Sequence, residues 1–410
     1  DRPTPTCTGT GIETMNEISG NLGCLTRPSN ALLSTDQTPA TFWVVNTQNY
    51  IFDNVAAGSS NYGFWINPEG AVTGTSAGTP QAEGVCPNHL PLLLFRDNVA
   101  HSNGRYGLRI YDEWFPRRVP CLAVDDTNPY VSSVLGPLLT YRNKVNGVQI
   151  SRVAQLVLRA FQVVDNGLRG LELPGAQGGL FLGPWGSNIL DMLLLVGTTA
   201  ETEAAAGSAS LRVGIETAAW HRLLVRNVTF VNYAAVNYAA VVGLAKEHFS
   251  PKGGGWETRF EGVTWVNAPR RTRWRHSHEG VFLDLDGSFS EQAAGSSVVA
   301  HNALLGSAEA FPECISDSRY SGGGEGHPGL VCRGLRFARV ALNAATPTTA
   351  LQYVDLLVKQ AGERGAFVRA ADAAYLVDKW RPVSAATGGD RFLVAMDASR
   401  TTLSAAAVGA

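Results

Sequence analysis

Two carboxylates lie close together in the segment Asp284-Leu285-Asp286-Gly287-Ser288. Their spacing places both on one side of a strand end, beside a glycine turn, where hard oxygen donors could bind calcium. The segment lacks the further acidic and amide ligands of an EF-hand loop. A turn in which the aspartates accept hydrogen bonds from backbone amides is the alternative. Calcium at Asp284 and Asp286 is therefore the one candidate cofactor.

A basic segment around a tryptophan is the second place where chemistry could occur. Arg271, Arg273 and Arg275 surround Trp274. Guanidinium groups form paired hydrogen bonds with carboxylate or sulfate, and an indole face can stack on a sugar ring. In a strand, however, alternation puts the three arginines on one face and Trp274 on the other. The segment is a candidate surface for acidic glycans or other acidic ligands, and a solvated basic strand is the alternative.

The pair His101-Ser102 resembles a base beside a nucleophile, but the sequence has no Gly-x-Ser-x-Gly elbow. Ala57-Gly58 holds the equivalent place in a related stretch, so a packed histidine explains the pair better. Asp53 and Asp97 also recur at matching positions, which the corner geometry of a repeat explains better than acid–base catalysis. We assign no catalytic residue.

Composition and charge exclude several classes of function. The 410 residues include 33 basic and 35 acidic side chains, which gives a formal net charge of −2. Neutralising nucleic-acid phosphates requires a surplus of positive charge that is absent here. No apolar run reaches the roughly 18 residues that span a bilayer. The sequence therefore predicts neither a nucleic-acid partner nor a membrane span.

An internal repeat supplies the elements that would position these residues. The stretches 53–66 and 97–110 match without a gap at an offset of 44 residues, and later copies follow in steps that are multiples of about 22. Asparagine tolerates left-handed backbone geometry, and its amide can hydrogen-bond neighbours, so we expect the repeat-corner asparagines to stack in a ladder. These asparagines are Asn54, Asn98, Asn143, Asn166 and Asn188.

Short alternating strands within this period predict an all-β fold, a parallel β-helix that forms a solenoid of about 22-residue coils. We expect the β-helix over residues 1–300, with C-terminal β-rich coils or a small subdomain over residues 301–410. Segments rich in glycine, proline, serine and threonine would leave the solenoid as excursion loops. These loops are expected at 68–87, 111–137, 197–210, 246–256 and 316–328.

Several strings, in order, resemble a known family. They are GIETMN (11–16), DQTPATFWV (36–44), NVAAGS (54–59), NVAHSNG (98–104) and DLDGS (284–288). They resemble the parallel β-helix region of the fibrocystin and fibrocystin-L group. That group is related to the cell-surface hyaluronidase called transmembrane protein 2 and to cell-migration-inducing hyaluronan-binding protein. The resemblance is dense over residues 11–173 and patchy to about residue 340.

The resemblance implies a right-handed β-helix associated with a G8 domain in a large extracellular or membrane-anchored glycoprotein. Its expected role is structural or adhesive. A stiff scaffold would present loops to other extracellular chains, to remaining domains of the same protein, or to acidic glycans. The alternative is a hyaluronidase-like glycosidase acting on an acidic polysaccharide, with catalytic residues largely upstream of this sequence. We expect an extracellular or cell-surface location, with a ciliary surface or a cell wall as specific settings.

The six cysteines suit disulfides in such a protein, with free buried thiols as the alternative. One pair encloses a glycine-rich loop, and the resemblance supports a cysteine on each side of such a loop. A second pair brackets the second repeat, and the third remains by elimination. In that order the pairs are Cys314 with Cys332, Cys86 with Cys121, and Cys7 with Cys24.

Asn227-Val228-Thr229 is the only Asn-x-Ser/Thr sequon without proline. In a secreted protein it is a candidate glycosylation site. Because it lies in a strand-like run, its side chain must face outward to carry a glycan.

Overall fold

The computed structural model describes the chain in segments separated by gaps. The described residues are 15–29, 37–125, 127–173, 188–199, 212–217, 223–235, 237–242, 257–274, 281–300, 313–320 and 329–339, together with four later strands within 356–396. Among these residues nearly all regular structure is strand, and helix is confined to three short 3-10 turns, η2 (Gly74–Ser76), η3 (Pro87–His89) and η6 (Ser318–Tyr320). The all-β prediction is confirmed. Within these ranges no helix is long and apolar enough to cross a membrane.

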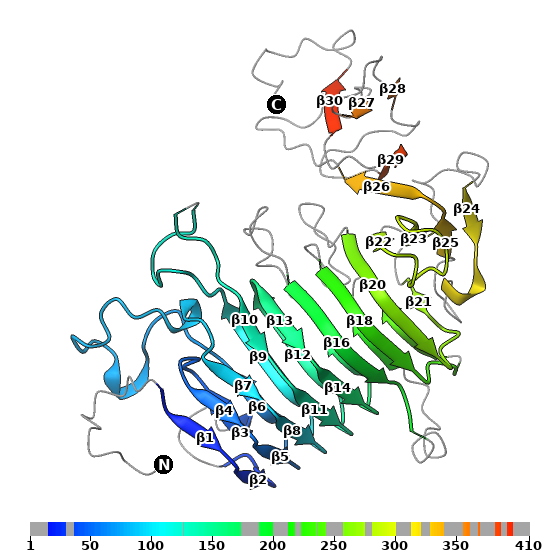
Figure 1. Ribbon diagram of the computed structural model, residues 1–410. Helices are drawn as coiled ribbons and strands as arrows, with labels where there is room; N and C mark the ends of the chain where they lie inside the picture. The colour runs from blue at the N-terminus through cyan, green and yellow to red at the C-terminus, as the bar shows by residue number, and fades with distance from the viewer. Residues whose placement is uncertain are drawn as a thin grey trace.

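Two long sheets contain most of the strands (Figure 1). The larger sheet has 17 strands. They are β1 (Glu17–Ser19), β2 (Leu22–Cys24), β4 (Tyr50–Phe52), β5 (Val55–Ala57), β7 (Leu94–Arg96), β8 (Asn98–His101), β10 (Ser133–Leu135), β11 (Leu138–Tyr141), β13 (Leu156–Arg159), β14 (Phe161–Val164), β16 (Asn188–Val196), β18 (Leu223–Val231), β20 (Glu257–Val266), β22 (Val281–Asp284), β23 (Ser297–Ala300), β24 (Cys314–Ser316) and β25 (Gly329–Cys332).

The second sheet has eight strands in the order β21-β19-β17-β15-β12-β9-β6-β3. Their bounds are β3 (Ala40–Val44), β6 (Tyr62–Ile66), β9 (Tyr106–Trp114), β12 (Asn146–Val153), β15 (Arg169–Glu172), β17 (Arg212–Glu216), β19 (Tyr238–Val242) and β21 (Thr272–Arg273). Every neighbouring pair in this sheet is parallel, and each strand pairs with the equivalent strand of the next repeat.

The 44-residue offset seen in the sequence is one repeat, not two. Asn54 bonds directly to Asn98, 44 residues away, and the same kind of step is 33 residues between Asn21 and Asn54 and 23 between Asn143 and Asn166. The extra residues lie in loops, since residues 67–93 separate β6 from β7 and contain η2 and η3. The shortest step is therefore close to the expected 22 residues, and the longer steps contain an excursion.

Left-handed residues mark the corners between the strands of the larger sheet. Asp53 and Asp97 have φ of 54° and 53°, and they lie at the same corner of successive repeats. Further along the sheet, Asn227 and Gly262 occupy this corner with φ of 53° and 62°. Where a buried asparagine follows the corner, as Asn54 and Asn98 do, the preceding residue has the left-handed geometry, so Asp53 rather than Asn54 makes the turn. This corrects the expectation that the repeat asparagines themselves adopt that geometry.

Apolar side chains from both sheets form one continuous core. Ile51, Phe95, Phe161 and Phe230 from the larger sheet and Phe64 from the smaller sheet are each at most 1% exposed. Phe64 packs edge-on against Phe95 with ring centroids 5.4 Å apart. This alternation of inward apolar residues and outward polar ones is the period-two pattern that the sequence predicted.

Parallel pairing ends at β22. This strand pairs in parallel with β20, but β23 pairs with β22 in the antiparallel direction, and β25 then pairs antiparallel with both β23 and β24. Later strands form separate small antiparallel sheets. These are β26 (Leu335–Arg339) with β29 (Pro382–Ala386), and β27 (Leu356–Gln360) with β28 (Val368–Arg369) and β30 (Phe392–Met396).

Candidate functional site

The eight-stranded sheet repeats a four-residue motif: a glycine, an apolar residue, a variable residue and, in most copies, a second apolar residue. The motif begins at Gly63, Gly107, Gly147, Gly170 and Gly214. Its second position is buried in the core in each copy, and these residues pair with one another across the strands. Because side chains alternate along a strand, the third position lies on the opposite face of the sheet.

The third positions form one row across five strands. Their register partners follow in the order Trp65, Arg109, Gln149, Glu172, Glu216. Trp43 extends the row at the β3 end, where it pairs with Trp65. The row changes in character from aromatic, through a cation and an amide, to two carboxylates.

The aromatic end of the row combines exposed rings with one arginine. Trp43 stacks on Trp65 with centroids 5.5 Å apart, and Trp43 is 49% exposed whereas Trp65 is 8% exposed. The Arg109 guanidinium carbon lies 4.8 Å from the Tyr62 ring centroid and 4.1 Å from that of Tyr111. We call these five residues the aromatic–arginine platform. Such contacts fix a guanidinium against the rings without neutralising its charge.

The hydrogen bonds of Arg109 are all to neutral groups. Nη1 donates to the Tyr62 hydroxyl at 2.9 Å and Nε donates to Gln149 Oε1 at 3.3 Å. Within the described part of the chain, no carboxylate forms an ion pair with Arg109. The cation is thus positioned at the platform with its charge unpaired.

The carboxylate end of the row is bound within the protein. Glu172 and Glu216 are register partners on adjacent strands. Glu172 accepts a hydrogen bond from Asn146 Nδ2 at 2.5 Å, whereas Glu216 is fully buried and forms an ion pair with Arg169. Two neighbouring carboxylates are what a glycosidase uses, but the burial and ion pairing of Glu216 suit a structural role better.

Asp284 and Asp286 both cap backbone amides of a turn. Asp284 is fully buried, and its carboxylate accepts from the backbone of Gly287 at 2.9 Å and of Ser290 at 2.7 Å. Burial raises the pKa of Asp284 despite these bonds. Asp286 accepts from the Gly262 amide at 2.7 Å; burial raises the pKa of Asp286, but hydrogen bonds from Ser288 and Gly262 outweigh it and lower the pKa overall.

These contacts correspond to the turn that the sequence left open as an alternative to calcium. Within the described ranges no group of three or more His, Cys, Asp or Glu side chains could hold a metal ion. Calcium at Asp284 and Asp286 would have to bind carboxylate oxygens that already accept backbone hydrogen bonds.

Two members of the expected basic surface are not on the surface. Trp274 is fully buried and stacks on Phe282 with centroids 4.5 Å apart. Arg271 is 6% exposed and donates to the Tyr320 hydroxyl at 2.8 Å and to Glu291 Oε1 at 2.5 Å. Arg273 is partly exposed, and Arg275 lies outside the described residues. The structure therefore does not gather these side chains into one outward patch.

The corner asparagines lie on three rows instead of one ladder. Asn54 and Asn98 share the first row with Asn21. Asn143 and Asn166 share the second with Asn103, which bonds to Asn143 Oδ1 at 2.9 Å.

Asn188 lies on a third row, where its Oδ1 accepts from the Leu156 amide at 3.0 Å. Asn49 accepts from the Asn16 amide in the same way. The prediction of a single ladder was wrong because the steps between these asparagines join three different corners of the repeat.

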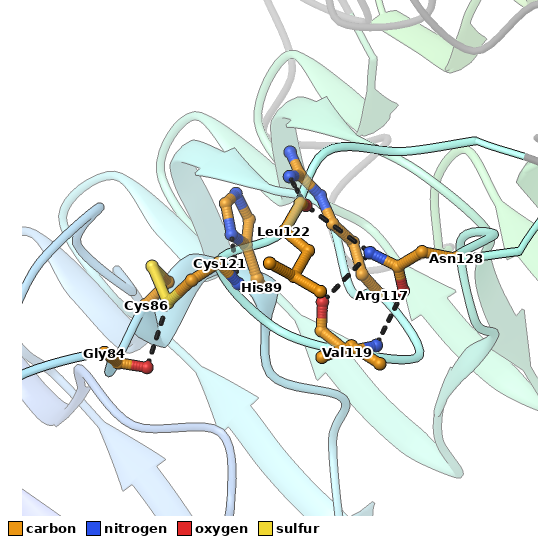
Figure 2. The surroundings of a disulfide bond; sticks show 8 residues. All are labelled: Gly84, Cys86, His89, Arg117, Val119, Cys121, Leu122 and Asn128. Atoms are coloured by element: carbon orange, nitrogen blue, oxygen red, sulfur yellow. Dashed lines mark hydrogen bonds between the residues drawn. A yellow bond between two sulfur atoms is a disulfide. The ribbon is translucent and has the colours of Figure 1, made fainter.

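The described part of the chain contains two disulfides, and both join expected partners. Cys86 and Cys121 connect two excursion loops, with Cα atoms 5.3 Å apart (Figure 2). Cys314 lies opposite Cys332 in the antiparallel pair β24–β25, and the two are bonded. Cys24 is exposed and carries no disulfide in the described part of the chain, and its expected partner Cys7 lies outside that part.

Two further residues from the sequence analysis lie on the larger sheet. Asn227 is exposed in β18, as glycosylation requires, and its Nδ2 donates to Asp191 Oδ1 at 3.2 Å. His101 stacks on Tyr141 with centroids 4.7 Å apart, and its Nδ1 lies 3.1 Å from the Ser102 hydroxyl. The ring is therefore held by packing, and burial lowers the pKa of His101.

The aromatic–arginine platform is not among the sites predicted from the sequence. The signal was present in the glycine-initiated motif, whose third position can be aligned without gaps at residues 65, 109, 149, 172 and 216. The contact of Trp43 with Trp65 could not be found in this way, because no glycine precedes Phe42 and the strand before β6 lacks the motif.

Strands that pair in parallel from one repeat to the next place the chain among the repetitive β proteins. The CEMIP beta-helix family model matches residues 8–108 of the chain. Fibrocystin-L of Mus musculus is 29% identical over 355 residues, which is 83% of this chain and 8% of that protein. The human cell surface hyaluronidase CEMIP2 is 30% identical over 202 residues, 38% of this chain and 14% of that protein.

The human cell migration-inducing and hyaluronan-binding protein is 30% identical over 159 residues, 35% of this chain and 11% of that protein. The predicted resemblance is thus confirmed as a relationship. The aligned region spans only 8% of the length of the fibrocystin-L proteins. Together with two disulfides, which persist in oxidising compartments, these similarities indicate a segment of an extracellular or cell-surface protein.

Proposed function

We propose that the chain is a stiff structural and adhesive segment of a large extracellular, fibrocystin-like cell-surface protein, built as a right-handed parallel β-helix. One observation supports this most directly. From β1 to β22 in the larger sheet, and from β3 to β21 in the smaller, each strand bonds in parallel to the equivalent strand of the next repeat without a break. Such a series keeps outward residues in fixed rows, which suits presentation to partner chains, to other domains of the same protein, or to glycans.

In this proposal residues 1–300 form the β-helix and residues 301–410 form C-terminal β-rich coils or a small subdomain. The antiparallel pairing of β22 with β23 supports a change of architecture close to residue 300. An extracellular setting, such as a ciliary surface or a cell wall, would maintain the two disulfides.

Small-angle scattering of the purified chain tests the scaffold. We expect a pair-distance distribution of an elongated particle, because each added repeat extends a parallel stack by about 4.8 Å. A distribution typical of a sphere of the same mass would contradict the proposal. The adhesive part is tested by passing extracellular proteins and glycans over the immobilised chain, and retention of neither would contradict it.

A second candidate function is a glycosidase acting on an acidic polysaccharide, as the names of the hyaluronidase relatives suggest. The adjacent carboxylates Glu172 and Glu216 favour it, because paired carboxylates carry out glycoside hydrolysis. The test is the size of hyaluronan after incubation with the chain, with and without calcium. Size loss that disappears in E172Q and E216Q would support this candidate, and unchanged polymer with folded protein would contradict it.

A further inference from the structure

We propose that the aromatic–arginine platform binds a glycan chain that carries carboxylate or sulfate groups. The inference rests on the adhesive role proposed above and assigns it to one place, the outer face of β3, β6 and β9. The platform consists of Trp43, Tyr62, Trp65, Arg109 and Tyr111.

Exposed aromatic rings are the first reason. Trp43 is 49% exposed and Tyr111 is 39% exposed, and each is the one exposed residue of its strand. The Trp43–Trp65 stack offers a flat apolar surface whose orientation is fixed by the register of β3 with β6. Sugar rings present flat C–H faces that pack against such rings, and aromatic groups with few rotatable bonds lose little entropy on binding.

The unpaired charge is the second reason. Nine arginines of the described chain form ion pairs with carboxylates. They include Arg152, Arg169, Arg212, Arg226 and Arg319. Arg109 instead has only neutral partners, and Tyr62 and Gln149 take two of the five N–H donors that a guanidinium has.

Arg105 adds a second cation of this kind. It donates to the same Tyr62 hydroxyl at 3.4 Å and forms no ion pair with a described carboxylate. A carboxylate or sulfate group on a ligand would complement both cations and form charge-assisted hydrogen bonds with Arg109.

An unsatisfied donor at the platform is the third reason. Nε1 of Trp65 is buried and has no hydrogen-bond partner in the described structure, while Trp65 as a whole is 8% exposed. Buried polar groups in native proteins are nearly always bonded, so Nε1 of Trp65 is a donor of the platform that still lacks an acceptor within the described structure. Glycan hydroxyl, ring and acidic oxygens are acceptors of that type.

Isothermal titration of the full 410-residue chain tests this proposal. The probes are heparin, hyaluronan and dextran oligosaccharides of equal length, so that sulfate, carboxylate and neutral sugars are compared directly. We expect at least one acidic probe to bind about tenfold more tightly than dextran, and Trp43→Ala and Arg109→Gln each to weaken that binding by about tenfold. Arg109→Lys keeps the charge but loses the planar fork, so its effect should be intermediate.

Matched controls lie on the larger sheet. Arg96 stacks over Phe52 at 5.0 Å, as Arg109 stacks over its rings, but it is paired with Asp97. Tyr50 is 37% exposed and serves as the control for Trp43. Arg96→Gln and Tyr50→Ala should leave the affinity within about twofold of the parent chain.

Three results would overturn the proposal: no binding of either acidic probe by folded chain, equal binding of dextran, or an equal loss in Arg96→Gln. Circular dichroism of every variant establishes that it is folded. Failure here would leave the scattering profile unchanged, so the loss of this site is distinguishable from failure of the scaffold itself.

Discussion

At Asn143 the side-chain amide forms hydrogen bonds in both directions along the series of repeats. Its Oδ1 accepts from the backbone N and from Nδ2 of Asn103 at 3.1 and 2.9 Å, and its Nδ2 donates to Asn166 Oδ1 at 2.9 Å. All three side chains are at most 5% exposed. Because chains of buried hydrogen bonds polarise one another, the row satisfies corner amides that the strands leave unpaired.

Replacing Asn143 with alanine should therefore destabilise the chain by about 2 kcal/mol or more, because it leaves the Asn103 amide buried without an acceptor. Urea denaturation followed by circular dichroism measures the loss. Asn67→Ala is the control, since that side chain bonds only to exposed Glu69. Equal stability of the two variants would show that the rows contribute little.

His89 makes the loop region sensitive to pH. Burial, with a smaller contribution from Arg117, lowers the pKa of His89 from 6.5 to about 4, and its Nδ1 lies 3.3 Å from the Cys121 amide (Figure 2). In the unfolded chain His89 titrates near its ordinary value. The stability gained from neutral His89 is thus fully present above pH 6.5 and is lost as the pH falls from 6.5 towards 4.

Thermal unfolding at pH 7 and pH 5 checks this, with His89→Asn as the comparison because asparagine supplies an acceptor that does not titrate. The melting temperature of the parent chain should fall more between these pH values than that of His89→Asn. An identical fall in both would mean that other groups set the pH dependence.

At the scale of the strand, the glycines of the repeated motif allow the close approach of neighbouring strands. A Cβ built on Gly147 would lie 2.8 Å from Asn166 Nδ2 and 2.9 Å from the Gly170 carbonyl oxygen. Both neighbours are fixed, one in the asparagine row and the other in the backbone of β15. The glycine of the motif therefore allows β12 and β15 to lie this close together in the eight-stranded sheet.

Gly147→Ala should destabilise the chain by about 1–3 kcal/mol through overpacking. Gly70→Ala is the control, since its Cβ would meet only Asn88 Nδ2, at 3.9 Å, and its effect should stay within about 0.5 kcal/mol. Denaturant titration of both variants measures the difference. If Gly147→Ala left the free energy of unfolding unchanged, β12 and β15 could move apart without loss of stability.

The excursion loops around β9 are held together by a disulfide and by the backbone. Besides the Cys86–Cys121 bond, the Arg117 amide donates to the His89 carbonyl at 3.0 Å and the Phe115 amide donates to the Asn88 carbonyl at 2.8 Å. The loops thus form one unit at the side of the strand stack.

Replacing Cys86 and Cys121 with serine should cost about 4 kcal/mol by the chain-entropy estimate for a cross-link across 35 residues. Limited proteolysis with mass spectrometry should show faster cleavage within 115–132, while the strands stay protected. Unchanged cleavage would show that the backbone bonds alone hold the loops.

For the whole molecule, the sequence predicted the strand content and the two described disulfides well, because inward apolar alternation and loop-bracketing cysteines are local patterns. The prediction of one asparagine ladder was wrong because a step along the chain, as between Asn98 and Asn143, can join two different corners of the repeat. It also misplaced Trp274, since a single basic strand gives no indication of which of its faces meets the core. The platform at Trp43 was missed because it depends on register between distant strands.

Glycosylation of Asn227 belongs to this scale too, because a glycan there would occupy the larger sheet and leave the eight-stranded sheet free. We expect the chain secreted from a eukaryotic host to lose mass on treatment with a peptide-N-glycosidase, and Asn227→Gln to abolish the shift, as it removes the only proline-free sequon. Equal masses before and after treatment would contradict this.

The unbroken series of parallel pairings also determines how the protein would respond to mechanical force. Hydrogen bonds between strands run from one repeat to the next, so tension along the series acts on every interface at once, and the weakest pairings should yield first. The contact of β7 with β10 pairs only Phe95 with Leu135, whereas β16 and β18 share eight paired residues. A pulling experiment should therefore find that the β7–β10 pairing opens before the β8–β11 and β9–β12 pairings of the same interface, which have four and six register partners.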